Sequence, residues 1–423
     1  MFSRFLGSQC ASSEGKLVFG DISARRLVEE YGTPLYVMDA ADLRGKMREF
    51  KAAAPGCKVS YGSKAASALA ILQVAREEGL DVDVASLGEL EAALRAGFEP
   101  KQITFHGNNK TDAELEAGTR LGVGAVVLDH LSEIRRLAGL GTPQRVMIRL
   151  APGVDPDTHK AISTGQEDSK FGFNIADGRA EDAVDEVLKH RCLRFIGYHV
   201  HVGSQLMTSE SHVAAVRRAA AFAVAMNSKT GEVDEICAGG GLGVRYLPSD
   251  EPELFAEHCR SVIAAVTDGF GGRPPLISFE PGRALVAEAG TTLYRVGAMK
   301  KIDSRTYISV DGGVADNPRP QLYGATYTAM NADRLEEPHD FPFRVSGRHC
   351  ETDTLISEAL LPASTGEGDV IAVQCTGAYN HAMASNYNRY PRPAMVIVGD
   401  GDTFEAVRRE TVDDLFRTES VRP

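Results

Sequence analysis

The sequence predicts an α/β protein in which a (β/α)8 barrel precedes a mostly β domain. Short β-branched runs alternate with amphipathic helical patterns from residue 58 to residue 285, and eight strands can be counted. The roughly 230 residues involved suit a barrel of eight strands and eight helices. After Arg283 the pattern changes to strands separated by turn residues, with few helical stretches.

The strands of the barrel can be placed by their carboxyl ends. They are expected to end near Tyr61, Ala85, His106, Leu128, Leu150, His201, Ala238 and Phe279. Amphipathic helices are expected between them, for example at residues 67–78, 87–96 and 209–226. An open, doubly wound sheet would show the same number of strands, so counting alone leaves that alternative open.

The second domain is expected to be discontinuous in sequence. Its strands are predicted at residues 292–300, 305–310, 343–349, 369–374 and 394–398. The apolar run 35–38 precedes the first helix of the barrel, and we assign it to the β domain. The barrel therefore spans residues 40–285, and the β domain comprises residues 1–39 and 286–423. The stretch 151–164 is rich in Pro, Gly and Asp, and we expect a long loop over the barrel mouth.

Composition excludes several classes of protein. The chain of 423 residues has no uncharged apolar run long enough to span a bilayer, and its first 20 residues lack the apolar core of a signal peptide. A net charge of −12 without a long basic run argues against a nucleic-acid partner. The seven scattered cysteines form no C-x-x-C pair, which argues against a disulfide framework and for a reducing, cytoplasmic location.

Two loops fall where barrels of this kind commonly bind phosphate, after strands 7 and 8. Strand 7 runs into Gly239-Gly240-Gly241-Leu242-Gly243, and strand 8 runs into Glu280-Pro281-Gly282-Arg283. Consecutive glycines let backbone N–H groups approach a phosphate without interference from side chains. The alternative is that the glycine run is only a tight turn. A Rossmann fingerprint is excluded, because no acidic ribose partner follows at the required distance.

A lysine follows the first barrel strand, in Tyr61-Gly62-Ser63-Lys64. At the barrel mouth, burial and cationic neighbours can lower the pKa of such a lysine and free its amine for a Schiff base. Most lone lysines are simply solvated, which is the alternative for Lys64. The run 57–61 is apolar enough to lie in the core, and this weakens the alternative.

Two histidines on strand 6 could bind either a metal ion or a cofactor ring. In His199-Val200-His201-Val202-Gly203-Ser204, the period of two places both imidazoles on one face. A metal pair would need further ligands, and His106, Asp129 and His130 are available, but we find no clear partner after strand 8. We therefore expect no metal. An imidazole stacked on a cofactor ring, with Ser204 toward a phosphate, needs no further ligand.

The β domain contributes two more motifs. Cys350-Glu351-Thr352-Asp353 follows one predicted strand, and Gly377-Ala378-Tyr379 follows another. Without further context, Cys350 would be taken for an inert buried thiol and Glu351 for a surface acid.

Together these pieces resemble the diaminopimelate decarboxylases, relatives of the eukaryotic ornithine decarboxylases. The resemblance runs over nearly the whole chain, from the Tyr-Gly-Thr-Pro-Leu-Tyr-Val segment at residue 31 to the Arg-Glu-Thr-Val-Asp-Asp-Leu segment at residue 409. The motifs between them, in order, lie at residues 61–64, 159–165, 169–172, 199–205, 239–243, 280–283, 311–323, 350–351, and 377–379 with 385–388.

The resemblance implies pyridoxal 5'-phosphate as cofactor. It implies that Lys64 binds the cofactor covalently, that His201 stacks on its ring and that Glu280 pairs with the pyridine nitrogen. The groups expected near the phosphate are Ser204, the backbone of Gly240, Gly241 and Gly243, the loop residues Gly282 and Arg283, and the hydroxyl of Tyr379.

The resemblance also implies a substrate site. Arg283, Arg319 and Tyr323, with Tyr379, would hold the distal carboxylate of the substrate. Glu351 would receive the distal ammonium, and Cys350 would return a proton after CO2 departs. In this family the last two residues reach across from a second subunit, which implies a homodimer. A substrate without a second carboxylate would leave the arginine charge unpaired. We therefore expect meso-2,6-diaminopimelate as substrate, with L-lysine and CO2 as products.

The sequence departs from the family pattern at one loop. Relatives usually have Cys-Glu-Ser-Gly-Asp, whereas this chain has Cys350-Glu351-Thr352-Asp353-Thr354. The fifth-position acid, which in relatives can pair with the equivalent of Lys170 across the dimer interface, is here Thr354. The alternative is that Asp353 takes its place. The usual alanine after Tyr61 is Gly62, a minor change. The altered loop would lie beside the distal end of the substrate, so it bears on substrate identity.

Four alternatives follow from these motifs. They are a related decarboxylase acting on another diamino or carrier-bound amino acid, a racemase of the same barrel class, a non-catalytic homologue that binds the cofactor, and a metal hydrolase.

Overall fold

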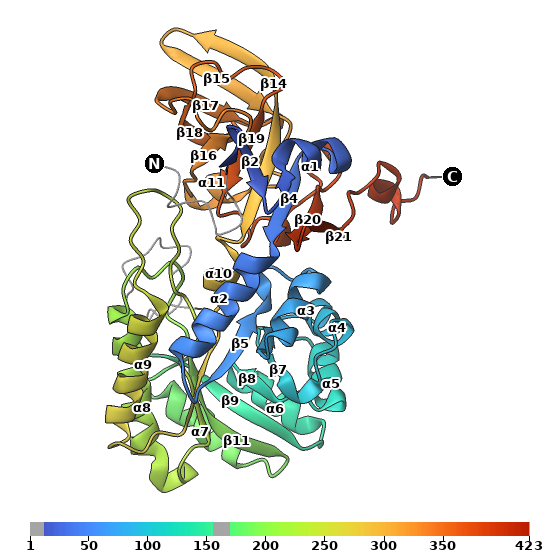
Figure 1. Cartoon of the computed structure of the whole chain (residues 1–423). Coiled ribbons are helices and arrows are strands. Elements are labelled where there is room, and N and C mark those ends of the chain that lie inside the picture. Colours follow the sequence, from blue (N-terminus) through green and yellow to red (C-terminus); the bar gives the residue numbers. More distant parts are fainter. Residues whose placement is uncertain (1–11, 155–169, 423) are drawn as a thin grey trace. The chain divides into compact units, whose positions relative to one another are not determined.

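The computed structural model describes residues 12–154 and 170–422, which form two compact units (Figure 1). The barrel unit comprises Lys46–Val244 and Glu251–Leu285. The β unit comprises the residues up to Gly45, the segment Arg245–Asp250 and the residues from Val286 onward. Three expected features lie outside the described residues: the motif 159–165, most of the loop 151–164, and Ser169 of the motif 169–172.

The barrel unit contains a closed ring of eight parallel strands. Hydrogen-bonded neighbours run in the order β5-β6-β7-β8-β9-β11-β12-β13, and β13 pairs with β5 to close the ring. These strands are β5 (Lys58–Gly62), β6 (Asp81–Val84), β7 (Ile103–Phe105), β8 (Ala125–Leu128), β9 (Gln144–Ala151), β11 (Leu193–Val200), β12 (Glu235–Cys237) and β13 (Leu276–Phe279). The barrel prediction is confirmed, each expected strand end lies within one residue of the observed end, and closure excludes the open sheet.

The helices follow the strands in alternation, as Figure 1 shows for α3 to α9. The α-helices are α1 (Ala24–Tyr31), α2 (Ala40–Ala53), α3 (Leu69–Glu77), α4 (Leu87–Arg95), α5 (Asp112–Leu121), α6 (Leu131–Gly139), α7 (Arg179–Leu188), α8 (Glu210–Thr230), α9 (Phe255–Gly269), α10 (Arg283–Val286) and α11 (Arg319–Tyr323). Short 3-10 turns lie at Ser63–Ala65, Pro100–Gln102, His381–Met383, Tyr387–Arg389 and Asp413–Phe416. A membrane-crossing helix, which needs both length and continuous apolarity, is not found among the described residues.

Local sequence explains where these elements begin and what they bury. Thr111 and Glu114 form a reciprocal capping box that starts α5, and Ser86 caps α4 through the N–H of Glu89. Barrel strands are covered on both faces and therefore read as nearly continuous apolar runs, such as the fully buried Ala-Val-Val-Leu of β8.

The β unit is built around a mixed sheet. Its strand order is β18-β17-β15-β14-β4-β20-β21, and β19 pairs with β14 and β16. These strands are β4 (Leu35–Asp39), β14 (Gly290–Ile302), β15 (Arg305–Val310), β16 (Ala329–Asn331), β17 (Phe341–Ser346), β18 (Thr354–Leu361), β19 (Val370–Gln374), β20 (Ala394–Gly399) and β21 (Asp402–Val407). The early strand β4 lies between β14 and β20, as expected for the apolar run 35–38.

Several strands of the structure were not predicted. In the barrel unit, β10 (Phe173–Asn174) pairs with the end of β9. In the β unit, β16, β18, β21 and the small sheet of β1 (Ser12–Ser13), β2 (Lys16–Phe19) and β3 (Ile22–Ser23) were missed. The sequence of β18, Thr-Leu-Ile-Ser-Glu-Ala-Leu-Leu, lacks a strict alternation, and it becomes a strand because it pairs with β17. The segment Arg245–Asp250 lies in the β unit, although the predicted boundaries place it in the barrel.

Candidate active site

Three loops at the carboxyl ends of barrel strands come together around the glycine run. A β-carbon at Gly240 would overlap the carbonyl of Glu280, and one at Gly241 would overlap the carbonyl of Gly203. Gly239 and Gly241 also have φ values of 76° and 115°, which side chains rarely tolerate. The loops after β11, β12 and β13 can therefore meet only because these positions are glycine.

A buried cation lies beside this loop. The guanidinium of Arg283 is 5% exposed and donates to the Ser204 hydroxyl through Nε (3.2 Å) and Nη2 (2.9 Å). The N–H of Gly240 donates to His201 Nδ1 at 3.3 Å, and that of Gly243 donates to the Leu206 carbonyl at 2.8 Å. Ser204 and Arg283, both predicted to be near the phosphate, are therefore in direct contact, while Gly243 already uses its N–H to hold the turn.

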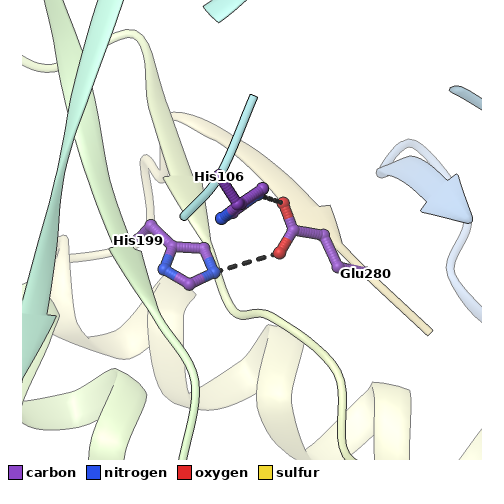
Figure 2. Close-up of side chains that lie close together, drawn as sticks. All are labelled: His106, His199 and Glu280. Carbon is purple, nitrogen blue, oxygen red and sulfur yellow. Dashed lines mark hydrogen bonds and ion pairs between the residues drawn. The ribbon is translucent and has the colours of Figure 1, made fainter. Parts of the chain in front are cut away.

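The carboxylate of Glu280 is held by two histidines from other strands (Figure 2). His106 Nε2 lies 2.9 Å from Oε1, and His199 Nε2 lies 3.0 Å from Oε2. Burial raises the pKa of Glu280, but the electrostatic attraction and hydrogen bonds of the N–H groups of the two histidines outweigh burial and hold this pKa well below its usual value. Burial lowers the pKa of His199 to about 4, so this imidazole is neutral at pH 7. Glu280 is therefore an ionised acceptor with fixed orientation.

This triad corrects the expectation that strand 8 offers no partner for a histidine. Glu280 follows β13, and its carboxylate and the nearest ring nitrogens of His106 and His199 all lie within 4.8 Å of one another, a spacing that could hold a metal ion. His201 of the H-x-H pair is not part of the triad. Hydrogen bonds to the two Nε2 atoms already satisfy both carboxylate oxygens, so the triad needs no ion for its stability.

Lys64 lies in the 3-10 turn directly after β5 and is exposed within the chain. Its charge contributes to lowering the pKa of His201, after the larger effect of burial. The charge of Lys64 also lowers the pKa of Asp83, a buried residue of β6. Burial and the charge of Glu280 have larger effects in the opposite direction, so the pKa of Asp83 is raised to about 7. A β-carbon at Gly62 would lie 3.3 Å from the Gly282 Cα and 3.4 Å from Asp83 Oδ2, so this position packs against both residues.

Sequence reasoning missed Asp83 and Arg149. Arg149 is a buried residue of β9 that lies 3.7 Å from Asp129 Oδ2 and has the ring of Phe171 4.4 Å from its guanidinium carbon. Both are buried charged residues close to the carboxyl ends of their strands. In a barrel, that position is a signal for function and could have identified them.

A pair of buried histidines supports the start of the glycine loop from the outer helices. His212 of α8 lies 2.6 Å from the carbonyl of Ala238 through Nε2 and 2.9 Å from His258 Nε2 through Nδ1. A carbonyl only accepts, so His212 carries its proton on Nε2 and receives a hydrogen bond from His258 of α9. Ala238 directly precedes the glycine run, and its position is thus fixed from behind.

The β unit holds a second buried arginine between two tyrosines. Arg319 begins α11, is 6% exposed, and donates from Nη1 to the Tyr327 hydroxyl at 2.5 Å. Its guanidinium carbon lies 4.8 Å from the ring centre of Tyr246 and 5.6 Å from that of Tyr327. Its Nε is buried without a hydrogen-bond partner among the described residues. The guanidinium of Arg319 is therefore held in one orientation, and its Nε–H remains available to donate a hydrogen bond.

Two predicted tyrosines are found in the same unit. Tyr323 ends α11 and is half-buried. Tyr379 is also half-buried, has a positive φ of 61° and directly precedes Asn380, whose Oδ1 lies 3.4 Å from the Tyr327 hydroxyl. Tyr379 thus adjoins the cluster around Arg319.

Cys350 and Glu351 are both exposed in the β unit, which overturns the alternative of an inert buried thiol. The other five cysteines of the described residues are buried or half-buried. The N–H of Cys350 donates to Asn388 Oδ1 at 2.9 Å, and the hydroxyl of Tyr387 donates to Glu351 Oε1 at 2.6 Å. The loop is therefore ordered by contacts with the segment 387–390.

Comparison with known proteins gives a consistent result. A family model described as "Pyridoxal-dependent decarboxylase, pyridoxal binding domain" matches residues 40–287. The chain is 43% identical to a diaminopimelate decarboxylase of Bacillus subtilis, over 97% of each protein. It is 40% identical to that of Mycobacterium tuberculosis, over 96% of this chain and 95% of the relative. A diaminopimelate decarboxylase structure from M. jannaschii in complex with L-lysine is 30% identical, with a TM-score of 0.92 and 98% of each chain covered.

The histidine pair behind the glycine loop predicts a pH dependence of stability. Burial lowers the pKa of His258 from 6.5 to about 4, and burial with the neighbouring His258 lowers that of His212 to about 3. Below pH 6.5 the unfolded chain binds protons that the folded chain does not, so the free energy of unfolding falls as the pH drops toward 4. His258→Gln should flatten the dependence of the thermal midpoint on pH between 6.5 and 4.5, measured by scanning fluorimetry.

Midpoints at pH 8 provide the control, because there the histidines are neutral in both states and any difference reports packing alone. An unchanged slope below pH 6.5 would contradict the assignment of His258 as a buried neutral base.

Proposed function

The chain belongs to the pyridoxal-dependent decarboxylases, and among them to the diaminopimelate decarboxylases, and we propose that it converts meso-2,6-diaminopimelate to L-lysine and CO2. This proposal is carried by two features found together at the barrel mouth. One is a glycine loop beside a buried arginine, and the other is a carboxylate that two histidines keep ionised. These features offer one site for a phosphate and another for a protonated ring nitrogen.

The residues at the barrel mouth fit pyridoxal 5'-phosphate. Ser204, Arg283 and the N–H of Gly241 would hold the phosphate, with Gly282 in the same turn. Gly240 and Gly243 would instead shape the loop, because their N–H groups already donate to His201 Nδ1 and to the Leu206 carbonyl. When bound, the cofactor supplies an electron sink for the pair left behind by departing CO2.

Three residues would control the cofactor ring. Lys64 would hold it covalently through the side-chain amine, and His201 would pack on its face. Glu280 would accept a hydrogen bond from the protonated ring nitrogen through a remaining lone pair, because each carboxylate oxygen can accept more than one hydrogen bond. Asp83, with its pKa raised to about 7, would exchange a proton with the amine of Lys64 when the amine of the substrate replaces that of Lys64 on the cofactor.

The β unit supplies groups of the right charge for the substrate. Arg319 would bind the distal carboxylate, with Tyr323 and Tyr379 as hydroxyl donors and Arg283 contributing a second cation. Holding Arg319 between Tyr246 and Tyr327 removes rotamer freedom before the substrate binds, which lowers the entropic cost of binding. A substrate with only one carboxylate would leave this buried charge without a partner.

Cys350 and Glu351 would complete the site from a second subunit. Glu351 would pair with the distal ammonium, and the Cys350 thiol would donate a proton to the carbon that loses CO2. Exposure of both side chains within one chain is consistent with such a role in a homodimer. The thiol must stay reduced to donate its proton, which fits a cytoplasmic location.

The reaction itself is tested with Lys64→Ala. Purified protein with pyridoxal phosphate should release CO2 and L-lysine from meso-diaminopimelate, but not CO2 from L-lysine or L-ornithine. Lys64→Ala should lower kcat by at least about 10²-fold, because the covalent group and its proton transfers are lost. Borohydride reduction followed by mass spectrometry should find the cofactor on the Lys64 peptide of the wild type.

Mixing Lys64→Ala with Cys350→Ala provides the control for shared sites. Each variant alone should be inactive, and random mixed dimers should restore up to about a quarter of wild-type activity, because one of their two sites is intact. Turnover by Lys64→Ala at the wild-type rate would contradict the proposed chemistry, and failure of the mixture to regain activity would contradict the shared site.

Specificity for the second carboxylate is tested with Arg319→Met. The loss of a charge-assisted pair should reduce kcat/KM for diaminopimelate on the order of 10²-fold. The preference for diaminopimelate over L-lysine, measured as the ratio of the inhibition constant of L-lysine to the KM for diaminopimelate, should shrink by a similar factor. Arg344→Met is a matched control, because Arg344 also packs over a tyrosine, Tyr307, but on β17. Unchanged preference in Arg319→Met would contradict the role of Arg319.

A further inference from the structure

Asp353 is buried although it ends an exposed run of residues. Cys350, Glu351 and Thr352 are exposed, whereas Asp353 is 2% exposed. Its backbone has a positive φ of 40°, a conformation that turns the chain inward and that few side chains adopt. Burial of a carboxylate is unfavourable unless several donors surround it, so its partners show what the burial achieves.

Three N–H groups surround the Asp353 carboxylate. Oδ2 accepts from the backbone N–H of His349 at 2.9 Å and from His349 Nδ1 at 2.7 Å. Oδ1 accepts from the backbone N–H of Val314 at 2.7 Å. A carboxylate only accepts, so the His349 proton lies on Nδ1.

The surrounding backbone is shaped to admit this carboxylate. A β-carbon at either Gly313 or Gly347 would overlap Asp353 Oδ2. Gly347 also donates its N–H to the Asp353 carbonyl at 2.7 Å. Two glycines on separate loops thus leave space for one side chain.

The contacts of Asp353 join two loops with different proposed roles. Val314 belongs to the loop that leads from β15 to Arg319, and His349 directly precedes Cys350. The N–H of Arg348 donates to the Gly312 carbonyl at 3.0 Å, which is a second connection between the same loops. The loop of the proposed proton donor is therefore anchored on the loop of the proposed carboxylate-binding arginine.

The His349 ring transmits this anchoring to Glu351. It lies nearly parallel to Tyr387, at 19° with ring centres 6.0 Å apart, and edge-on to Tyr390 at 5.1 Å. The hydroxyl of Tyr387 donates to Glu351 Oε1 at 2.6 Å. A change in the orientation of the His349 ring would therefore move the partner of Glu351.

We propose that Asp353 is a positioning residue that sets Cys350 and Glu351 for reaction by fixing His349 and the loop of Arg319. This inference rests on the proposed decarboxylation. In relatives an acid stands one position later and can reach the partner subunit. In this chain the acid is Asp353, and its carboxylate binds groups of its own chain. During turnover the S–H bond of Cys350 breaks, its proton bonds to the carbon that lost CO2, and water reprotonates the thiolate.

The test uses Asp353→Asn in the full-length protein with its cofactor. An asparagine can accept at only one oxygen, so its amide faces a donor N–H. We expect kcat for diaminopimelate to fall at least tenfold and the solvent deuterium isotope effect on kcat to increase. Both changes follow if proton delivery from Cys350 becomes limiting. Alkylation of Cys350, followed by mass spectrometry of its peptide, should become several-fold faster because the loop is released.

Two further variants separate positioning from folding. Asp303→Asn is the matched control, because Asp303 also has a positive φ, 52°, but is exposed in the β14–β15 hairpin. His349→Phe keeps an aromatic ring beside both tyrosines and removes the Nδ1 donor together with Nε2, which has no hydrogen-bond partner among the described residues. It should shift all three measurements in the same direction as Asp353→Asn. It serves as the test if Asp353→Asn does not fold.

The inference would be overturned if the wild type is active and the variants match it. That is, kcat, the isotope effect and the alkylation rate would be unchanged in His349→Phe and in Asp353→Asn, if the latter folds. A wild type that does not decarboxylate diaminopimelate would instead overturn the proposed function, while the alkylation rates would still report whether Asp353 anchors the loop.

Discussion

The proposed chemistry depends on the carboxylate of Glu280, which is held between His106 and His199. An ionised carboxylate in a buried site is stable only if donors replace the water it has lost. Two imidazoles from β11 and the end of β7 supply these donors, at 3.0 and 2.9 Å. Because His199 is kept neutral by burial, it donates without bringing a charge that would cancel the carboxylate. The result is a negative group with one orientation at the carboxyl end of β13.

Hydrogen-bond partners also fix other charged groups of the barrel unit and of the β unit. Three buried charged groups are fixed by protein partners before any ligand arrives: Arg283 by Ser204, Arg319 by Tyr327, and Asp353 by His349. Preorganised groups need little rearrangement during a reaction, which is how fixed charges and dipoles lower barriers. Asp83 differs, because its burial and, to a smaller extent, the negative charge of Glu280 raise its pKa to about 7. A group with such a pKa can take up and release a proton at physiological pH.

Most of the barrel could be predicted from the sequence because its signals are local. Strand ends, the glycine run and the Glu280–Arg283 turn depend on residues close together in the chain. The pairing of His106 with Glu280 could not be predicted, because 174 positions separate them and only closure of the barrel brings them together. The strand β18 was missed because its pairing with β17, and not its alternation, determines its conformation. The burial of Asp353 was equally hidden, since it depends on a positive φ and on a glycine 40 positions away, Gly313, as well as on Gly347 of its own loop.

The most direct test of the account is the kcat of Glu280→Gln at saturating meso-diaminopimelate. Glutamine keeps the size of the side chain but removes the negative charge that would keep the cofactor ring nitrogen protonated. We expect a loss on the order of 10²-fold in kcat, as for other preorganised electrostatic groups, with the cofactor still bound. A kcat within about twofold of the wild type, at full cofactor occupancy, would contradict the central role of this carboxylate.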